Sequence, residues 1–363
     1  MKDRPLLSFV VACYNQEAFI GEAIDGALAQ TYSPLEIIVS DDCSEDRTFE
    51  IVRERLAVYR GPHQVRLARN DRNLGIGGNV NRAMELCRGE LVLLADGDDI
   101  SLPLRSEMTY QAWEESGRRA TSICLSYTTI SRDGADLGIR GLRGDPNDPR
   151  MFKPLEGDLF TFLSTRKPAV CGCSHAWSPS LFQYFGPLQS DLEDLMLSFR
   201  SLAIGQIVYV QQPLVKYRRH GKNVSFFAGG DDTTSFAHRE DRLRWVDEQT
   251  VRAYDNMLAD IEVLQAKGRI TSAERDRLTK EAQRIRTLYA MERQMIDGSL
   301  LTRLSTLAGT AARGNIGCAL RFMPRLLPQG MYRKLYLLRN HIRSAAVKKS
   351  PPAPGDSEKS IHA

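Results

Sequence analysis

Three acidic side chains stand close together in the sequence, directly after an apolar run that predicts a buried strand. The run is Leu91 to Ala95, and the acids are Asp96, Asp98 and Asp99. Carboxylates this close repel one another unless a cation lies among them. Mg²⁺ or Mn²⁺ binds one or two carboxylates together with phosphate oxygens and water, so the group predicts a divalent metal that neutralises charge on a departing diphosphate. The alternative is a simple cap, in which Asp98 or Asp99 binds backbone amides before a helix near Pro103.

A second acidic pair follows another apolar run, because Asp41 and Asp42 come directly after Leu35 to Ser40. Such runs alternate with helical patterns of about ten to fifteen residues, which is typical of βαβ units and a parallel sheet. Ligands of these sheets bind beyond the carboxyl ends of the strands. We therefore expect both acidic groups at one edge of the sheet.

The same kinds of pattern predict the other elements that position these residues. We expect strands at residues 6–12, 65–68, 122–130 and 206–210, helices at 18–29, 79–87 and 159–163, a helix from Arg47 capped by Asp46, and an amphipathic helix after Pro103. Residues 70–78, 138–149 and 229–234 are expected to form loops, with a turn at Asp133 and Gly134.

Two segments of the first third carry a family resemblance. The stretches SFVVACYNQEAFIGEAIDGALAQTYSPLEIIVSDDCSEDRT and NLGIGGNVNRAMELCRGELVLLADGDDI resemble the nucleotide-binding half of family 2 inverting glycosyltransferases with the GT-A fold. The resemblance covers almost all of residues 5–105 and implies a Rossmann-like α/β fold, with a mixed, mostly parallel sheet flanked by helices and a C-terminal helical extension.

The resemblance also implies a donor site for a nucleotide sugar, with a UDP-sugar favoured. Its implied contacts are Ala12, Tyr14, Glu17, Asp41, Asp42, Gly75, Asn79 and Asp96. Within this set, Asp41 or Asp42 would bind the base, and Asp96 would hold the ribose or the metal. Asp98 would ligate Mn²⁺ or Mg²⁺, while the loop with Gly75, Gly77 and Gly78 would let backbone approach the donor.

A later segment is similar to the acceptor half of the same family. It consists of GPLQSDLEDLMLSFRSLAIG and VYVQQPLVKYRRHGKNVS. In the family an acidic pair opens a helix, and the second acid of the pair is the general base. This position maps to Asp194, and Glu193 beside it would contact the acceptor. Asp191 and Glu193 remain alternatives for the base. His220 would touch the metal or the diphosphate, although a surface histidine is also compatible with the pattern.

An aromatic segment, GCSHAWSPS, lies just before this acidic pair. The resemblance places acceptor contacts here, and Trp177 with its neighbour His175 would supply them, since aromatic faces pack well against sugar rings. A tryptophan in the protein core is the alternative, because Leu181, Phe182 and Phe185 nearby are apolar.

Charge is distributed unevenly along the chain. The net charge is +4, yet residues 299–350 hold ten Lys or Arg and no Asp or Glu. Leu300, Leu304, Leu307 and Ala311 recur there at helical spacing. We expect either a basic amphipathic segment on an anionic membrane, near a carbohydrate or lipid-linked acceptor, or a helical cap with solvated charges. No nucleic-acid motif accompanies the charge, so we expect no nucleic-acid partner.

Four regions follow from these patterns. We expect a catalytic domain at residues 1–235 (nucleotide-binding half 1–105, acceptor half 106–235), a helical hairpin at 236–298, the basic segment at 299–350 and a disordered tail at 351–363. In the hairpin, Gly268 ends one helix, and Thr271 with Glu274 forms a capping box for the next.

Composition narrows the class of protein. Hydrophobic residues make up 42% and charged residues 26% of the chain, which is ordinary for a globular protein. No apolar run reaches the roughly 20 residues that cross a bilayer, so we expect a cytoplasmic protein, peripheral at the inner face of the plasma membrane. The seven cysteines are expected to be reduced and structural, because Cys171 and Cys173 lack the second pair of a zinc site.

The function expected from these patterns is inverting, metal-dependent transfer of a sugar to a hydroxyl acceptor, in the setting of cell-surface polysaccharide or glycolipid synthesis. A nucleotidyltransferase and a non-catalytic nucleotide-sugar binder are the alternatives. The first would carry a glycine-rich basic phosphate loop after the first strand, and the second has no use for a base. A dehydrogenase is excluded because its glycine motif would have to follow the first strand directly.

Overall fold

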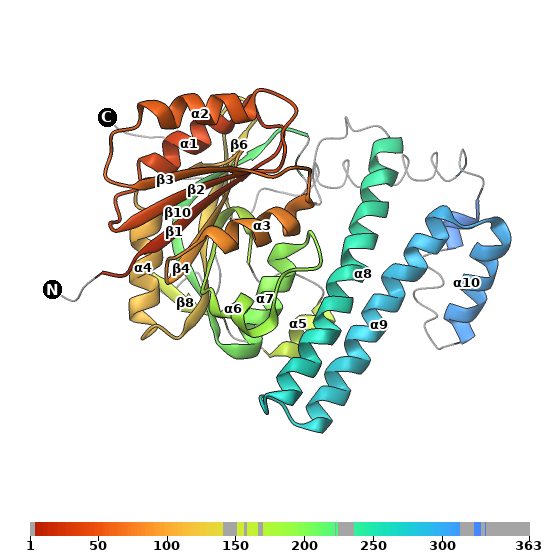
Figure 1. Ribbon diagram of the computed structural model, residues 1–363. Coiled ribbons are helices and arrows are strands. Elements are labelled where there is room, and N and C mark those ends of the chain that lie inside the picture. The colour runs from red at the N-terminus through yellow and green to blue at the C-terminus, as the bar shows by residue number, and fades with distance from the viewer. Residues whose placement is uncertain are drawn as a thin grey trace, which may run out of the picture. The chain divides into compact units, whose positions relative to one another are not determined.

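A computed structural model describes residues 4–140, 151–155, 158–165, 170–221, 223, 236–312, 323–327 and 331. The chain divides into two compact units (Figure 1). The first unit comprises Met1–Thr233 and Glu248–Thr287, and the second comprises Thr234–Asp247 and Leu288–Ala363. The strands and all residues of the acidic groups belong to the first unit.

The strands follow one another along the first unit as β1 (Leu7–Cys13), β2 (Leu35–Asp41), β3 (Gln64–Arg69), β4 (Leu91–Asp96), β5 (Ile100–Ser101), β6 (Ala120–Ser131), β7 (Asp136–Arg140), β8 (Phe152–Pro154), β9 (His175–Trp177) and β10 (Gln206–Arg219). The helices between and after them are α1 (Ile20–Leu28), α2 (Thr48–Val58), α3 (Gly75–Leu86), α4 (Arg105–Glu115), α5 (Leu159–Thr165), α6 (Ser180–Phe185), α7 (Glu193–Ile204), α8 (Phe236–Ala266), α9 (Ser272–Asp297) and α10 (Leu300–Ala312). Short 3-10 turns occur at Gly172–Ser174 and Met323–Leu326.

The strands form one mixed, mostly parallel sheet in the order β3-β2-β1-β4-β9-β6-β10-β5, with β7 paired to β6 and β8 to β10. Strands β1, β2, β3 and β4 are parallel neighbours, and β6 is parallel to β10. The short β9 runs antiparallel to both β4 and β6, so it joins the two parallel parts. The expected fold class, a mixed and mostly parallel α/β sheet with helices after it, is confirmed.

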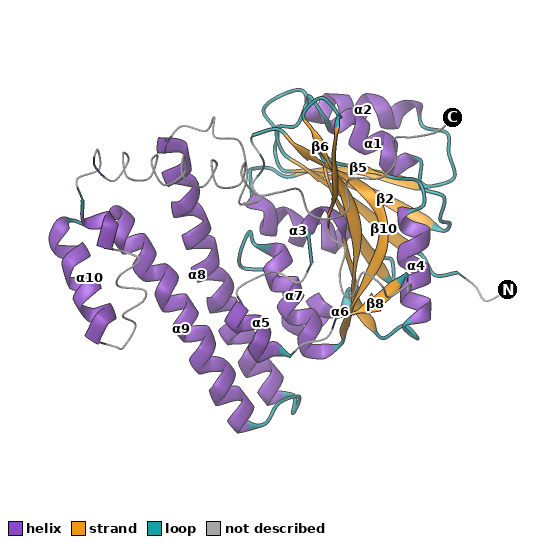
Figure 2. Ribbon diagram, turned by 180° about the vertical axis from the view of Figure 1, so that it is seen from behind, coloured by secondary structure: helices purple, strands orange, loops and turns teal. Residues whose placement is uncertain are grey.

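Helices cover both faces of the sheet, with α1, α2 and α4 on one face and α3, α6 and α7 on the other (Figure 2). Strand β1 is therefore apolar and buried along nearly its whole length, as is typical of a strand with two covered faces. Leu7, Phe9 and Val11 alternate onto the face of α1, where they pack in one core with Ile20 and Ile24. This core holds β1 in place beneath α1 and so fixes the position of its carboxyl end.

The main departures from the sequence patterns are at element boundaries. Helix α3 begins at Gly75, four residues before the expected start at Asn79, so the predicted glycine loop is the first turn of a helix. Strand β10 continues to Arg219 because it pairs with the long β6 past two bulges. Residues 138–140 belong to β7 rather than to a loop. The remainder of that predicted loop and the loop at 229–234 lie outside the described residues.

The long C-terminal helices agree with their sequence signals. Gly268 adopts a φ of 65° after α8, the left-handed conformation that glycine tolerates. At the start of α9, Thr271 and Glu274 form the predicted capping box, in which the Thr271 N–H donates to Glu274 Oε2 at 2.8 Å and the Glu274 N–H donates to Thr271 Oγ1 at 3.2 Å.

The described part of the second unit has a small core of its own. Met291, Met295 and Leu307 pack together, and Leu326 lies against them. In the predicted basic segment, residues 300–312 form helix α10. Most of the residues after 312, including the predicted tail, lie outside the described residues. Among the described helices, none is long and apolar enough to span a membrane.

Candidate active site

The ends of three parallel strands bring the two acidic groups to one edge of the sheet. In the register of the sheet, Cys13 at the end of β1 is paired with Asp41 on one side, and Ala12 is paired with Asp96 on the other. The Ala12 carbonyl also accepts the Gly97 N–H at 2.9 Å, which fixes the turn after β4. The expectation that both acidic groups share an edge is confirmed.

The acidic triad has the geometry of a cation site. One carboxylate oxygen from each of Asp96, Asp98 and Asp99 can be chosen so that all lie within 4.8 Å of one another. Asp99 is 2% exposed; its Oδ1 accepts the Arg218 N–H at 2.8 Å, while its buried Oδ2 has no hydrogen-bond partner among the described residues. A buried acceptor without a donor is costly, and hard oxygen ligands fit Mg²⁺ or Mn²⁺. The residues therefore fit a divalent cation.

Burial and mutual repulsion raise the pKa of the acids in this group. Desolvation raises the pKa of Asp96 to about 7, and the neighbouring carboxylate of Asp98 contributes in the same direction. Desolvation, then Asp98 and Asp96, raise the pKa of Asp99 well above its usual value. The group thus favours either a proton or a cation among its oxygens.

His220, which the sequence placed near the metal, lies against the triad. Its Nε2 is 2.7 Å from Asp98 Oδ2, and its ring stacks on Phe19 with centroids 4.7 Å apart. The backbone N–H of His220 donates to Asn223 Oδ1 at 2.9 Å. The imidazole is thereby held at the end of β10 with one nitrogen directed to the expected metal ligand.

Two acids from the later half of the unit complete the cluster. Glu193 and Asp194 open α7, where the helix dipole favours negative charge. Desolvation raises the pKa of Asp194 to about 6, although its Oδ1 accepts the Leu195 N–H at 2.7 Å. The pKa of Glu193 is raised well above normal by desolvation and then by Asp194 and Asp96. The charges of Asp96 and of the Glu193–Asp194 pair therefore act on one another across the two sequence segments.

A buried arginine that sequence reasoning did not single out lies beneath this cluster. Arg105 is fully buried; it donates to Ser101 Oγ at 2.8 Å and to the Leu94 carbonyl. Burial lowers its pKa to about 10, against the opposing fields of Asp96 and other anions. Its only sequence signal is a position at the start of the helix after Pro103, where a basic residue is unfavourable to the dipole. Arg105 therefore supplies a buried positive charge that acts on Asp96 and Asp99.

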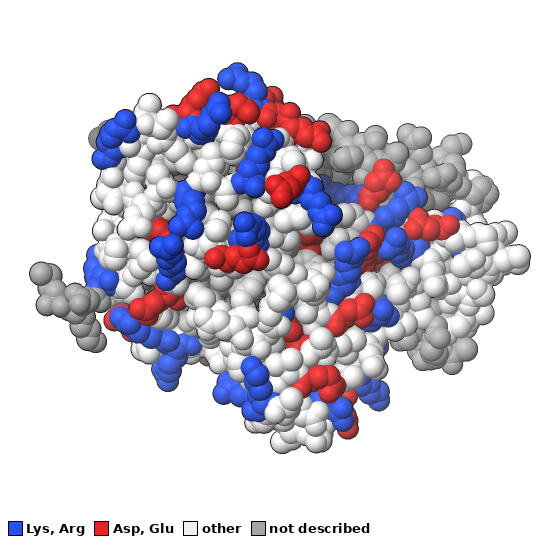
Figure 3. All heavy atoms as spheres, viewed as in Figure 1, with Lys and Arg blue, Asp and Glu red and all other residues white. Residues whose placement is uncertain are grey.

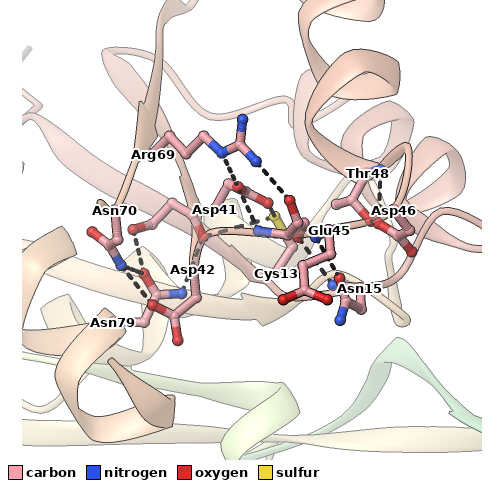
Figure 4. A network of polar contacts seen from close by, with 12 residues as sticks. Cys13, Asn15, Asp41, Asp42, Glu45, Asp46, Thr48, Arg69, Asn70 and Asn79 are labelled. Carbon is pink, nitrogen blue, oxygen red and sulfur yellow. Dashed lines mark hydrogen bonds and ion pairs between the residues drawn. The ribbon is translucent and has the colours of Figure 1, made fainter. Parts of the chain in front are cut away.

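The paired acids at the end of β2, for which the resemblance implies contacts with a base, have different partners (Figure 4). Asp41 is fully buried, and its Oδ2 lies 3.3 Å from Arg69 Nε. Asp42 accepts the Leu74 and Gly75 N–H groups at 2.9 and 3.0 Å, so it caps α3. Both carboxylates are thus already engaged by the chain.

The start of α3 is also bound by an acid from the later half, because the Gly77 N–H donates to Asp191 Oδ1 at 2.9 Å. A Cβ on Gly77 would lie 2.3 Å from the Ser190 carbonyl oxygen, and one on Gly75 would lie 2.7 Å from Asp191 Oδ1. The close backbone approach that these glycines permit is therefore to this segment. Asn79 is buried and its Oδ1 accepts from Ser40 Oγ at 2.6 Å, so its amide is used inside the unit.

The loop after β1 is tied to the loop after β2. The Asn15 N–H donates to Ser44 Oγ at 3.0 Å, and Asn15 Oδ1 accepts the Glu45 N–H at 2.8 Å. Glu17 Oε2 accepts the Arg47 N–H at 3.1 Å, and Asp46, expected as the cap of α2, accepts the Thr48 N–H at 2.9 Å. Tyr14, by contrast, is 39% exposed at the same edge. Tyr14 and Glu17 are thus the members of the predicted donor set with exposed side chains.

Trp177 lies in the core, which favours the alternative that sequence reasoning left open. It is 1% exposed, its Nε1 donates to Met84 Sδ at 3.4 Å, and its ring packs on Phe182. His175 is fully buried, and desolvation lowers its pKa to about 3. A side chain without exposed surface has no face to offer a sugar, so the aromatic segment builds β9.

The thiols of Cys171 and Cys173 lie 3.5 Å apart and are free. Cys173 is buried, and desolvation raises the pKa of its thiol well above normal. No group of three metal-ligand side chains that includes them occurs among the described residues.

Comparisons with known proteins cover the first part of this site. The model of glycosyl transferase family 2 matches residues 8–163. EpsE of Bacillus subtilis (strain 168) is 29% identical over 149 residues, which are 41% of this chain and 51% of EpsE. The chain spans about half or less of the first curated relatives it matches.

Two solved structures are similar at low identity. TarS of S. aureus (residues 1–349, in complex with UDP-GlcNAc) has a TM-score of 0.49 and 17% identity, covering 90% of this chain and 91% of that one. The mannosyltransferase PcManGT of Pyrobaculum calidifontis, in complex with GDP-Man and Mn²⁺, has a TM-score of 0.49 and 17% identity, covering 98% and 89%. The part of this chain that matches the model of glycosyl transferase family 2, residues 8–163, contains the acidic group at the end of β4.

Proposed function

We propose that this protein is a metal-dependent, inverting glycosyltransferase that moves a sugar from a nucleotide-diphosphate sugar, a UDP-sugar in the first instance, to a hydroxyl of a carbohydrate or lipid-linked acceptor. The observation that carries the proposal is the meeting of the triad Asp96, Asp98 and Asp99 with Glu193 and Asp194. A metal site beside a carboxylate of raised pKa supplies the two functions that such a transfer needs.

Asp98, with His220 beside it, and the buried Asp99 would hold Mn²⁺ or Mg²⁺, as the unpartnered Asp99 Oδ2 and the 2.7 Å contact of His220 with Asp98 support. When bound, the ion stabilises negative charge on the diphosphate leaving group. Arg105 adds a fixed positive charge below the acids. On the proposed nucleoside side, Tyr14 is an exposed aromatic side chain that can stack on a base.

Asp194 is the proposed general base. Inversion requires a group that takes the acceptor hydroxyl's proton while the oxygen attacks the anomeric carbon from the face opposite the diphosphate. Its pKa of about 6 leaves the carboxylate largely ionised at neutral pH but basic enough to accept that proton. Glu193, whose pKa is raised further, and Asp191, whose Oδ1 is bound by Gly77, are less suited to the same task.

We further propose that the second unit binds an anionic membrane surface, where a lipid-linked acceptor would be found. Leu300, Leu301 and Leu304 of α10 are 59%, 79% and 45% exposed, and few charged side chains cover this helix on the face in Figure 3. The ten basic residues and no acidic ones at 299–350 supply the attraction to anionic lipid.

Vesicle sedimentation tests this membrane proposal. Phosphatidylglycerol-rich vesicles should retain the protein and phosphatidylcholine vesicles should not, and replacing the three leucines with serine should weaken retention. Val58→Ser, at an equally exposed apolar position (74%) on α2, is the matched control. Equal retention of all variants, or none by either vesicle, would remove the membrane proposal.

The nucleotidyltransferase alternative lacks support, because the loop after β1 carries Asn15, Gln16 and Glu17 in place of a basic phosphate loop. Calorimetric titration with UDP, GDP, CDP and TDP, with and without Mn²⁺, tests the donor site. Metal-dependent binding of one nucleotide to the wild type, lost in Asp98→Ala, is the expected result. If no nucleotide bound to folded protein at millimolar concentration, the donor site would have to be abandoned.

A further inference from the structure

The short segment that leads into α7 is held from two sides within the first unit. On the α3 side, Asn81 binds Leu188 twice, since its Nδ2 donates to the Leu188 carbonyl at 2.9 Å and its Oδ1 accepts the Leu188 N–H at 2.8 Å. Three residues further on, Asp191 Oδ1 accepts the Gly77 N–H at 2.9 Å. The segment therefore has fixed points at both of its ends on α3.

The other side is the part of α8 from Glu248 onward. Asn256 Oδ1 accepts the Gln189 N–H at 3.1 Å. Gln249 Oε1 accepts the Asp191 N–H at 2.9 Å, and the Gln249 carbonyl accepts from Ser190 Oγ at 2.9 Å. Three consecutive residues of the segment are thus bound by two side chains and one carbonyl of a helix far away in the sequence.

There is little room for the segment to shift. Ser190 is 4% exposed and Gln249 is 6% exposed, and a Cβ on Gly77 would meet the Ser190 oxygen at 2.3 Å. Below the segment, Arg200 of α7 and Asp260 of α8 form a buried ion pair, with Nε 2.8 Å from Oδ2. Helix α7 is therefore fixed to α8 at its middle as well as before its start.

We propose that Gln249 is a positioning residue for the carboxylate of Asp194, acting through the backbone of Ser190 and Asp191. This inference rests on the proposed function, in which Asp194 is the base. Asp194 follows Asp191 by three residues, and Ser190 Oγ accepts the Leu192 N–H at 3.1 Å, so the last residues before α7 form one hydrogen-bonded turn. Loss of the Gln249 acceptor would leave the Asp191 N–H without this partner and allow the turn to move.

The expected consequence is selective for the chemical step. The proposed metal ligands and the proposed contact at Tyr14 follow the ends of β4 and β1, whereas Gln249 binds Ser190 and Asp191 on the approach to α7. A misplacement of about 1 Å can cost about 100-fold in rate. A change at Gln249 should therefore lower kcat and leave KM for the donor almost unchanged.

Three variants separate this role from general support of the fold. Gln249→Met keeps the length of the side chain without its acceptor, and Gln249→Glu restores an acceptor oxygen. Asp255→Asn is the matched control on the same helix, because Asp255 is paired with Arg286 of α9 and its side chain is 49% exposed. Gln249→Asn withdraws the oxygen by one methylene and replaces Gln249→Met if that variant does not fold.

The assay follows nucleoside diphosphate release from UDP-N-acetylglucosamine and from GDP-mannose with Mn²⁺, with water as acceptor, together with hydrogen exchange of the amides of residues 188–195. Gln249→Met should lower kcat about tenfold or more, with KM for the donor within about twofold of the wild type, and should speed exchange in that segment. Gln249→Glu should recover most of kcat, and Asp255→Asn should match the wild type.

A kcat of Gln249→Met equal to that of an active wild type would overturn the inference, as would equal losses in Gln249→Met and Asp255→Asn. Unchanged exchange in residues 188–195 would overturn it as well. A folded wild type that releases nucleotide from neither donor would instead count against the proposed function. The two failures are therefore distinguishable in one set of measurements.

Discussion

The buried ion pair between α7 and α8 gives a prediction that requires no knowledge of the substrate. Arg200 is fully buried and Asp260 is 1% exposed. Arg200 donates to Asp260 at 2.8 and 3.2 Å and to the Gly186 carbonyl at 2.7 Å. Arg200→Met keeps much of the side-chain volume but leaves the Asp260 carboxylate and the carbonyl without a donor.

The expected cost is large because a buried charge is stranded. Removing one partner of a buried pair typically costs about 3–5 kcal/mol, so Arg200→Met should lower the free energy of unfolding of the first unit by about 4 kcal/mol at neutral pH. The double variant Arg200→Met with Asp260→Leu should regain most of that loss, since replacing both partners by apolar groups is often neutral or stabilising. Burial is costly for the Asp260 carboxylate, because desolvation raises its pKa even with Arg200 beside it.

Urea unfolding followed by tryptophan fluorescence measures this effect. Trp113 and Trp177 are buried in the first unit, so a Trp245→Phe background removes the tryptophan of the second unit from the signal. The matched control is Arg286→Met, which breaks the exposed pair with Asp255 and should cost at most about 1 kcal/mol. An Arg200→Met loss no larger than that of Arg286→Met would refute the argument.

Three further predictions concern the site. Asp98→Ala should abolish Mn²⁺-dependent binding of nucleoside diphosphate in calorimetry. The Mn²⁺ affinity of the wild type should rise with pH up to about 7, because Asp96 loses its proton over that range. An Mn²⁺ affinity that does not change with pH would contradict this prediction. Asp194 must be ionised to accept a proton, so kcat/KM should rise as the pH increases through about 6 and then level off. Asp194→Asn should remove this rise and lower kcat by about 10²–10⁴-fold. An unchanged pH profile in this variant would assign the base to another residue. Gly77→Ala should lower the free energy of unfolding by about 1–3 kcal/mol, since the new Cβ would meet backbone atoms. Gly21→Ala should raise it by about 0.4–1 kcal/mol, because its Cβ would meet only the end of a flexible arginine side chain. Changes of the same sign in both variants would refute the packing argument.

Local sequence patterns were sufficient to predict the parallel strands that position the acids. Apolar runs followed at once by acids, as at Asp41 and Asp96, predicted both the strands and the edge at which they end, because parallel strands bring their carboxyl ends together. The capping box at Thr271 and Glu274 was equally local and is confirmed. The start of α3 was misjudged, because helix propensity is low at glycine, while here two acids from elsewhere in the chain satisfy the first N–H groups.

The sequence by itself determined the family resemblance, the order of the main strands and helices up to residue 130, and the residue types that could bind a cation or act as a base. Only the tertiary structure decided which of them meet. It placed Arg105 beneath the acids, buried Trp177 in the core, and used Asp42 and Asp191 as caps of α3. The physical reason is that burial, charge coupling and hydrogen-bond partners depend on contacts between distant segments, whereas strand and helix signals depend on neighbours in the chain.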